Sequence, residues 1–269
     1  MQDLFKRIEQ TYHCTLGVYA VSLGQSPKRC LKFRANQVFP AASIIKLFVA
    51  WAILKEIDRG RLKLAEQIKI SPADKVSGHS IIADLDFKSL SVKNILYFLL
   101  AHSDNTAQNL LEKILPPQVI NRVIQQSGFL KTHFVSLTNS RPDNFSVTTP
   151  QETAKLLTAI WQAKHLSLQS SQLILNFLSQ TRDTYLGLRY LPCKLNVKKP
   201  EIINFYSKIG QLDQVVNNCL LLETKQDVLN ICVFINHLKV KKFKYNVDHR
   251  GAKLIAKITQ TIYHVLNSY

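Results

Sequence analysis

The spacing of hydrophobic and polar positions changes twice along the chain, and it predicts strands at both ends with helices between them. Near the amino terminus, a polar-faced stretch predicts a helix over residues 1–12, and two apolar runs predict strands over 17–23 and 30–35. Helical spacing then dominates from residue 43 to about residue 180, including 43–58, 91–102, 106–115, 117–127 and 150–164. After Pro200 three strands are expected, over 203–209, 214–223 and 228–237, followed by an amphipathic helix over 251–266.

These elements predict an α/β (α+β) fold in which one antiparallel sheet is built from both chain ends and flanked by the terminal helices. The helical middle forms an inserted all-α subdomain in this prediction. We place the α/β subdomain at residues 1–38 and 190–269 and the inserted subdomain at 39–189. A chain of 269 residues can bury a core of this kind as one domain.

The helix expected from residue 43 carries a serine and a lysine three positions apart, which places them on one face. The neighbours of Lys46 are apolar on nearly every side: Ile44, Ile45, Leu47, Phe48, Val49, Ala50 and Trp51. We therefore expect Lys46 to be buried, because a helix that is apolar all round lies inside a protein. Burial lowers the pKa of an amine, so that it could accept the proton of Ser43. The pKa would have to fall from ~10.4 to about 7, a change of roughly 4 kcal/mol. The alternative is a helix N-cap serine followed by a surface lysine.

A second motif, Ser103-Asp104-Asn105, lies between two expected helices. As chemistry, Ser103 could relay a proton to a leaving nitrogen. Asn105 could orient a substrate amide and hydrogen-bond Lys46. Taken alone, the motif is equally typical of a polar loop that caps the next helix.

A third motif, Lys208-Ile209-Gly210, ends the first late strand. Lys208 could hold a substrate carboxylate, with Gly210 beside it. The backbone N–H of Gln211 could join that of Ser43 in stabilising developing negative charge. Alone, Lys208 is more often a solvated charge at a strand end.

The three motifs together, in this order and approximate spacing, resemble those of class A β-lactamases and their penicillin-binding relatives. The similarity extends to the phrases around them, at Phe39–Ser43, His102–Leu111 and Val147–Pro150, and it covers essentially the whole chain. It implies an α/β sandwich with an inserted α subdomain and a serine hydrolase that forms an acyl-enzyme on Ser43. It also implies a small-molecule β-lactam or peptidoglycan-like substrate, and neither a metal nor a cofactor.

Two departures from this family alter the expected activity. The family carries a glutamate in its Ω-loop that activates the water releasing the acyl group, and residues 128–150 contain none. The nearest acids are Asp143, which reads as a turn residue, and Glu152, which reads as part of a helix capping box with Thr149. Ile209 stands where the family prefers a hydroxyl for the substrate carboxylate, and no arginine follows on the next strand. We expect slow deacylation and weaker antibiotic affinity.

Several functions therefore remain open. A β-lactamase-like serine hydrolase with poor turnover is the first. A D,D-peptidase acting on cell-wall peptides shares its chemistry, and a non-catalytic binding protein that keeps the fold is a third. A nucleic-acid binder is suggested only by charge, because no nucleic-acid-binding motif accompanies it.

Composition adds one distinctive property, a net charge of +17 from 35 basic and 18 acidic residues. An anionic cell-envelope polymer is a possible partner for such a surface. The densest basic cluster, Lys239 to Lys244, alternates with apolar residues as at a strand end. The five cysteines lack the spacing of a metal motif, and no charge-free stretch is long enough to span a membrane. Without an apparent secretion signal, we expect a cytoplasmic protein, or a periplasmic or secreted one if a leader has been removed.

Overall fold

The computed structural model describes the whole chain except residues 25–28, 138–139, 142–143, 182, 240–247 and 268–269. The chain folds into two compact units. The first unit comprises residues 1–44, 148–158 and 183–269, and the second comprises 45–147 and 159–182. The predicted subdomain boundaries at 38/39 and 189/190 lie six to seven residues from the unit boundaries at 44/45 and 182/183, and residues 148–158, placed in the inserted subdomain by the prediction, belong to the first unit.

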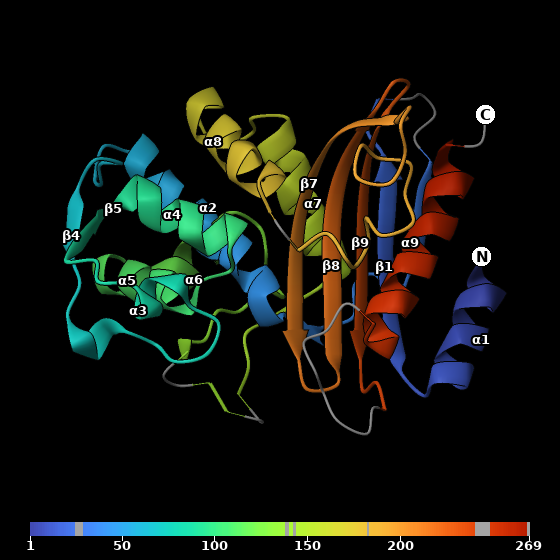
Figure 1. Cartoon of the computed structure of the whole chain (residues 1–269), viewed down its shortest axis with the longest axis horizontal. Coiled ribbons are helices and arrows are strands. Elements are labelled where there is room, and N and C mark those ends of the chain that lie inside the picture. Colours follow the sequence, from blue (N-terminus) through green and yellow to red (C-terminus); the bar gives the residue numbers. More distant parts are fainter. Residues whose placement is uncertain (25–28, 138–139, 142–143, 182, 240–247, 268–269) are drawn as a thin grey trace. The chain divides into compact units, whose positions relative to one another are not determined.

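The first unit is built on one five-stranded antiparallel sheet of order β2-β1-β9-β8-β7 (Figure 1). Its strands are β1 (Thr15–Ser22), β2 (Cys30–Phe33), β7 (Ile202–Leu212), β8 (Val215–Thr224) and β9 (Val228–Asn236). The amino-terminal β1 pairs with the carboxy-terminal β9 along its whole length, Thr15 opposite Asn236 and Ser22 opposite Leu229. The predicted fold class, with a sheet made from both chain ends, is confirmed.

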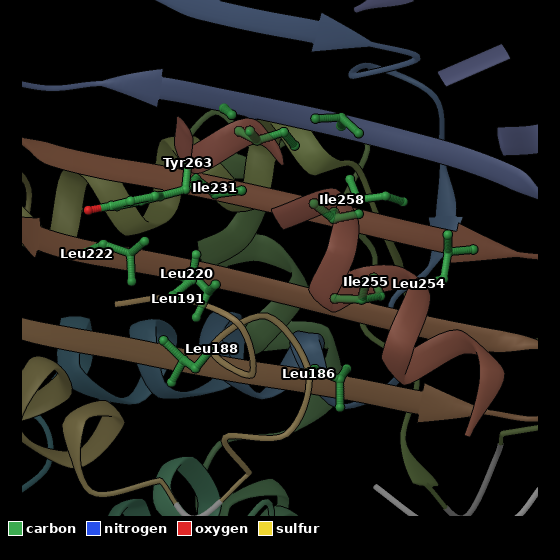
Figure 2. Close-up of a cluster of buried hydrophobic side chains, with 14 of the residues drawn as sticks. Leu186, Leu188, Leu191, Leu220, Leu222, Ile231, Leu254, Ile255, Ile258 and Tyr263 are labelled. Atoms are coloured by element: carbon green, nitrogen blue, oxygen red, sulfur yellow. The ribbon is translucent and has the colours of Figure 1, made fainter. Parts of the chain in front are cut away.

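Helices α1 (Gln2–Tyr12) and α9 (Arg250–Asn267) belong to this unit. The apolar stripe of α9, with Leu254 and Ile258, packs against alternate residues of the sheet such as Leu220 and Ile231 (Figure 2). Because successive side chains of a strand point to opposite faces, Asn230 lies on the other face, where its Nδ2 donates to the Ala154 carbonyl 2.7 Å away. Ala154 belongs to α7 (Pro150–Trp161).

The second unit is mainly helical, with α2 (Ile45–Asp58), α4 (Val92–Ala101), α5 (Asn105–Ile114), α6 (Pro117–Gln126) and α8 (Leu168–Ser179). Minor elements are β4 (Gln67–Lys69), β5 (Ser89–Ser91), η2 (Pro72–Asp74) and α3 (Ile81–Asp84). Eleven of the fourteen residues of α2 are buried, as its apolar sequence predicts. Among the described residues, no helix is long and apolar enough to span a bilayer.

Three features differ from the sequence prediction. Ser43 lies in a 3₁₀ turn, η1 (Ala42–Ile44), directly before α2. Helix α8 lies in the stretch to about residue 180 that was predicted to be mainly helical, but its bounds were not predicted, because its first turn, Leu-Gln-Ser-Ser, dilutes the apolar period. Ser167 caps this helix by accepting from Ser170 N at 3.1 Å. The two-residue strands β3 (Phe39–Pro40) and β6 (Val147–Thr148) were also missed. Most of the segment between the first two predicted strands, most of the basic cluster at 239–244, and Asp143 fall outside the described residues.

Candidate active site

Lys46 lies in the first turn of α2 with 1% of its surface exposed, which confirms the predicted burial. Its Nζ donates to Asn105 Oδ1 at 2.8 Å, to Ser103 Oγ at 3.4 Å and to the Ser103 carbonyl. The expected hydrogen bond between Asn105 and Lys46 is therefore present. A buried lysine amine held by oxygen atoms is rare in a structural core, because burial of a charge is costly.

The Ser103-Asp104-Asn105 segment connects α4 to α5, and Asn105 is the first residue of α5. Asp104 is fully buried and caps α5, accepting from Ala107 N, Ile82 N and Ser80 Oγ, each at 2.9 Å. Ser103 has φ +56°, a left-handed conformation that costs energy for a residue with a Cβ. We attribute the persistence of this conformation to the three bonds of Asp104, a positioning role that sequence reasoning did not assign.

Ser43 is half-buried and stands two residues before the start of α2. The preceding Ala42 has φ +47°, a second left-handed non-glycine residue, and Ile44 N closes the turn on the Ala41 carbonyl at 3.1 Å. The chain therefore bends sharply just before the serine. Such strain persists where surrounding contacts over-determine the backbone, as they do in functional turns.

These contacts come from β7 and β8 in the first unit. A Cβ on Gly210 would lie 2.8 Å from the Ala41 carbonyl oxygen and 3.1 Å from Ala42 Cβ, so only glycine permits this close approach. Gly210 thus lets the turn that carries Ser43 pack directly against β7. The next residue, Gln211, is buried, and Tyr185 donates to its Oε1 at 2.7 Å. Since β7 is an edge strand of the sheet, alternate backbone N–H groups along it face away from β8.

Lys208 is buried, with 2% of its surface exposed, which contradicts the alternative of a solvated strand end. Burial lowers the pKa of this lysine from its ordinary 10.5 to about 8, and the nearby Asp183 carboxylate opposes part of that shift. Its ammonium donates to the Ile209 carbonyl at 3.2 Å. Ile209 is likewise buried. Because its side chain is a hydrocarbon, this position of β7 offers no hydroxyl to a substrate.

Asn217 on β8 is a residue that sequence reasoning missed. It is fully buried, and its Nδ2 donates to the carbonyls of Pro40 at 2.8 Å and Ala41 at 3.3 Å. It therefore holds the backbone that leads into Ser43. Its position directly opposite Gly210 could have been inferred only once the register of β7 and β8 was known.

Asn217→Asp is expected to lower the free energy of unfolding by about 2–4 kcal/mol, because it replaces a donor with oxygen atoms facing two carbonyl oxygens. Chemical denaturation near neutral pH measures this loss. Asn94→Asp makes the same chemical change at an exposed helix position and should cost little. Equal stability of the two variants would contradict the clamp that we assign to Asn217.

Glu152 lies in the first turn of α7, where its backbone N–H donates to Thr149 Oγ1 at 3.0 Å. This is one of the two hydrogen bonds of the predicted capping box. Within the described residues, no cluster of three or more histidine, cysteine or acidic side chains could hold a metal ion.

Each unit thus contains part of the predicted site. The second unit brings together Lys46, Ser103 and Asn105. In the first unit, Gly210 contacts the turn that carries Ser43, and Lys208 and Gln211 lie on the same strand. Covalent continuity joins the two sets, since only Ile44 and Ile45 separate Ser43 from Lys46.

Known proteins that resemble this chain in sequence are beta-lactamases. A family model described as the beta-lactamase enzyme family matches residues 1–266. A beta-lactamase of Streptomyces fradiae is 32% identical over 134 residues, which cover 48% of this chain and 43% of that protein. One from Haemophilus influenzae is 28% identical over 185 residues, covering 66% and 59%. The chain thus spans about half the length of the curated relatives it matches.

The structural similarity covers more of the chain than the matches to the curated relatives do. The crystal structure of a beta-lactamase from Sphaerobacter thermophilus superposes with a TM-score of 0.86 at 23% identity, covering 99% of this chain and 97% of that one. At that identity the likeness establishes a shared fold.

Proposed function

This chain belongs to the beta-lactamase enzyme family, and from that premise we propose that it forms an acyl-enzyme on Ser43 with β-lactams or related amides and releases the acyl group slowly. The observation that carries the proposal is the buried Lys46 amine, held against Ser103 Oγ and Asn105 Oδ1 one helical turn after the serine.

In the proposed acylation, Ser43 Oγ attacks the amide carbonyl carbon while its proton passes to an uncharged Lys46 amine. The carbon–nitrogen bond then breaks, and the leaving nitrogen takes a proton delivered through Ser103 Oγ. Lys46 returns to its uncharged form, so the step is balanced. The hydrogen bond between Lys46 and Ser103 supports this route, because proton transfer requires heavy atoms within hydrogen-bond reach.

Substrate binding is assigned to the remaining predicted residues. Asn105 would orient the substrate amide, and Lys208 with Gly210 would take a substrate carboxylate. The backbone N–H groups of Ser43 and Gln211 would stabilise the oxyanion. This proposal requires the residues of both units to act on one substrate molecule.

Slow deacylation is supported by the absence of glutamate between Glu112 and Glu152 in the sequence. The backbone bond from Glu152 to Thr149 places Glu152 at the first turn of α7, as expected of a capping residue. A missing general base typically costs 10²–10⁴-fold in the step it serves. Acylation through Lys46 does not need that base, so the acyl-enzyme would accumulate.

Penicillin G is a suitable probe. A variant of PBP-A, whose fold matches this chain with a TM-score of 0.81 at 23% identity, was solved as an acyl-enzyme complex with penicillin G. We therefore choose this compound to test the present chain.

Time-resolved intact-mass measurement after mixing with penicillin G tests the proposal. We expect one adduct per chain with the mass of the whole penicillin, because opening a lactam ring expels no fragment. After free penicillin is removed, the adduct should persist over many times its formation time. No mass gain at any concentration would contradict acylation, and disappearance as fast as formation would contradict slow release.

A non-catalytic binding protein is the second candidate, favoured by the buried Ile209 in place of a hydroxyl. It predicts saturable binding of the probe with no gain in mass. A D-Ala-D-Ala peptide in the same assay tests the related D,D-peptidase activity, which would release D-alanine.

A further inference from the structure

The loop before β7 and the start of β7 itself expose several large apolar side chains. Tyr190, Leu195 and Val197 in the loop and Ile203 in the strand are 37–52% exposed. Ile203 sits at a register shift of the edge strand β7, which breaks the regular pairing with β8 there. Exposed apolar side chains gathered in one place commonly mark an interaction surface.

The end of α9 forms part of the same surface. A hollow of about 430 Å³ is lined by Tyr190 and Val197 from the loop together with His264 and Asn267 from α9. We call residues 190–203 with the last turn of α9 the loop–helix surface; all of it belongs to the first unit.

Three lysines are interleaved with these apolar residues: Lys194, Lys198 and Lys199 are exposed, and within the described part of the chain none forms an ion pair. The segment contains a single acid, Glu201, which accepts a hydrogen bond from Tyr263 Oη at 2.8 Å. The surface is therefore both apolar and positively charged, in a chain of net charge +17.

We propose that the loop–helix surface docks this protein onto an anionic lipid bilayer. Leu195, Val197 and Ile203 would enter the boundary between headgroups and acyl chains, and the lysines would lie against lipid phosphates. Flexible lysines around protruding apolar side chains suit a deformable anionic surface, because a bilayer needs no fixed complementary shape. An acidic protein would instead need a matching contour. The inference stands apart from the proposed function.

Co-sedimentation of the full chain with vesicles tests the proposal. Binding is expected to vesicles of phosphatidylcholine mixed with phosphatidylglycerol, to be much weaker to phosphatidylcholine alone, and to fall with added salt. Each lysine is worth about fivefold in partitioning, so replacing Lys194, Lys198 and Lys199 together by glutamine should reduce binding about 100-fold.

Two further variants separate this surface from charge in general. Lys63, Lys69 and Lys93 are exposed in the second unit, and replacing these three by glutamine removes the same charge elsewhere. This matched control should retain most of the binding. The pair Leu195→Ser and Val197→Ser keeps the charge and should still weaken binding several-fold; circular dichroism verifies that every variant is folded.

Equal losses in the two triple-glutamine variants would overturn the proposal, as would unchanged binding of the serine pair. Absence of vesicle binding by the unaltered chain would overturn it too. Retention on heparin without binding to vesicles would assign the charge to soluble polyanions instead. None of these outcomes depends on acylation by penicillin, so the proposal can fail while the proposed function stands.

Discussion

Ser43→Ala is expected to abolish the penicillin adduct completely, because the variant lacks the only oxygen to which the acyl group is assigned. The fold should be preserved, since Ser43 is half-buried and loses only a hydroxyl. Intact-mass measurement over a long exposure checks the result. Labelling of Ser43→Ala at the normal rate would show that the nucleophile is another residue.

Lys46→Ala separates the base from the nucleophile. Because the serine hydroxyl remains, acylation should continue at a rate lower by roughly 10²–10⁴-fold. Lys55→Ala provides a control on the same helix; Lys55 donates to the His165 carbonyl at 2.7 Å and is not assigned to the reaction. Similar rates for the two alanine variants would remove the role proposed for Lys46.

Lys208→Met is expected to stabilise the protein near neutral pH while it weakens acylation by carboxylate-bearing penicillins. A folded-state pKa of about 8 against the ordinary 10.5 corresponds to roughly 3 kcal/mol, the free energy that burial of the charged amine costs. Methionine has a similar shape and no charge to desolvate. A substitution that raises the stability of the protein while it weakens substrate binding is typical of a buried functional group.

The stability difference between Lys208→Met and the unaltered protein should depend on pH. Below about pH 8 the lysine is charged in both states and the whole cost is present. As the pH rises from about 8 to 10.5, the folded state loses its proton first, so the unfolded state binds more protons and the native protein gains stability relative to the variant. The advantage of Lys208→Met should therefore be largest at pH 7 and vanish near pH 10.5.

Urea denaturation of both proteins at several pH values measures the difference directly, and other titrating groups cancel in the comparison. A stability difference that stays constant from pH 7 to 10.5 would contradict the lowered pKa. If the variant were less stable at pH 7, the interactions of the Lys208 ammonium would outweigh its desolvation. Acylation by penicillin G, measured on the same samples, should fall independently of stability.

Much of the fold was predictable because its signals are local. The return to strand spacing after Pro200 predicted β7, β8 and β9 within a few residues, and the turn at 224–227 is closed by Thr224 N donating to the Asp227 carbonyl at 2.8 Å. The bounds of α8, which lies inside the predicted helical stretch, could not be set from the sequence because serine and glutamine occupy its first turn. Its start is stabilised by Asp58, which accepts from Ser167 and Ser170, more than a hundred residues away in sequence.

For the candidate site, the sequence by itself determined which groups are available and which of them must be buried. Lys46 is surrounded by apolar residues within its own helix, so its burial follows from local sequence. The neighbours of Lys208 are mixed, with Ser207 before it and Ile209 after it, so its burial was decided only when the strand took its place in the sheet.

The left-handed backbone at Ala42 and Ser103, the clamp supplied by Asn217, and the bonds from Ser80 and Ile82 to Asp104 were likewise decided by the tertiary structure. The physical reason is common to all of them. An amide or carboxylate can hold a strained turn only when strand register or loop packing brings it within 3 Å, and those contacts join residues whose separation in the chain carries no periodic signal.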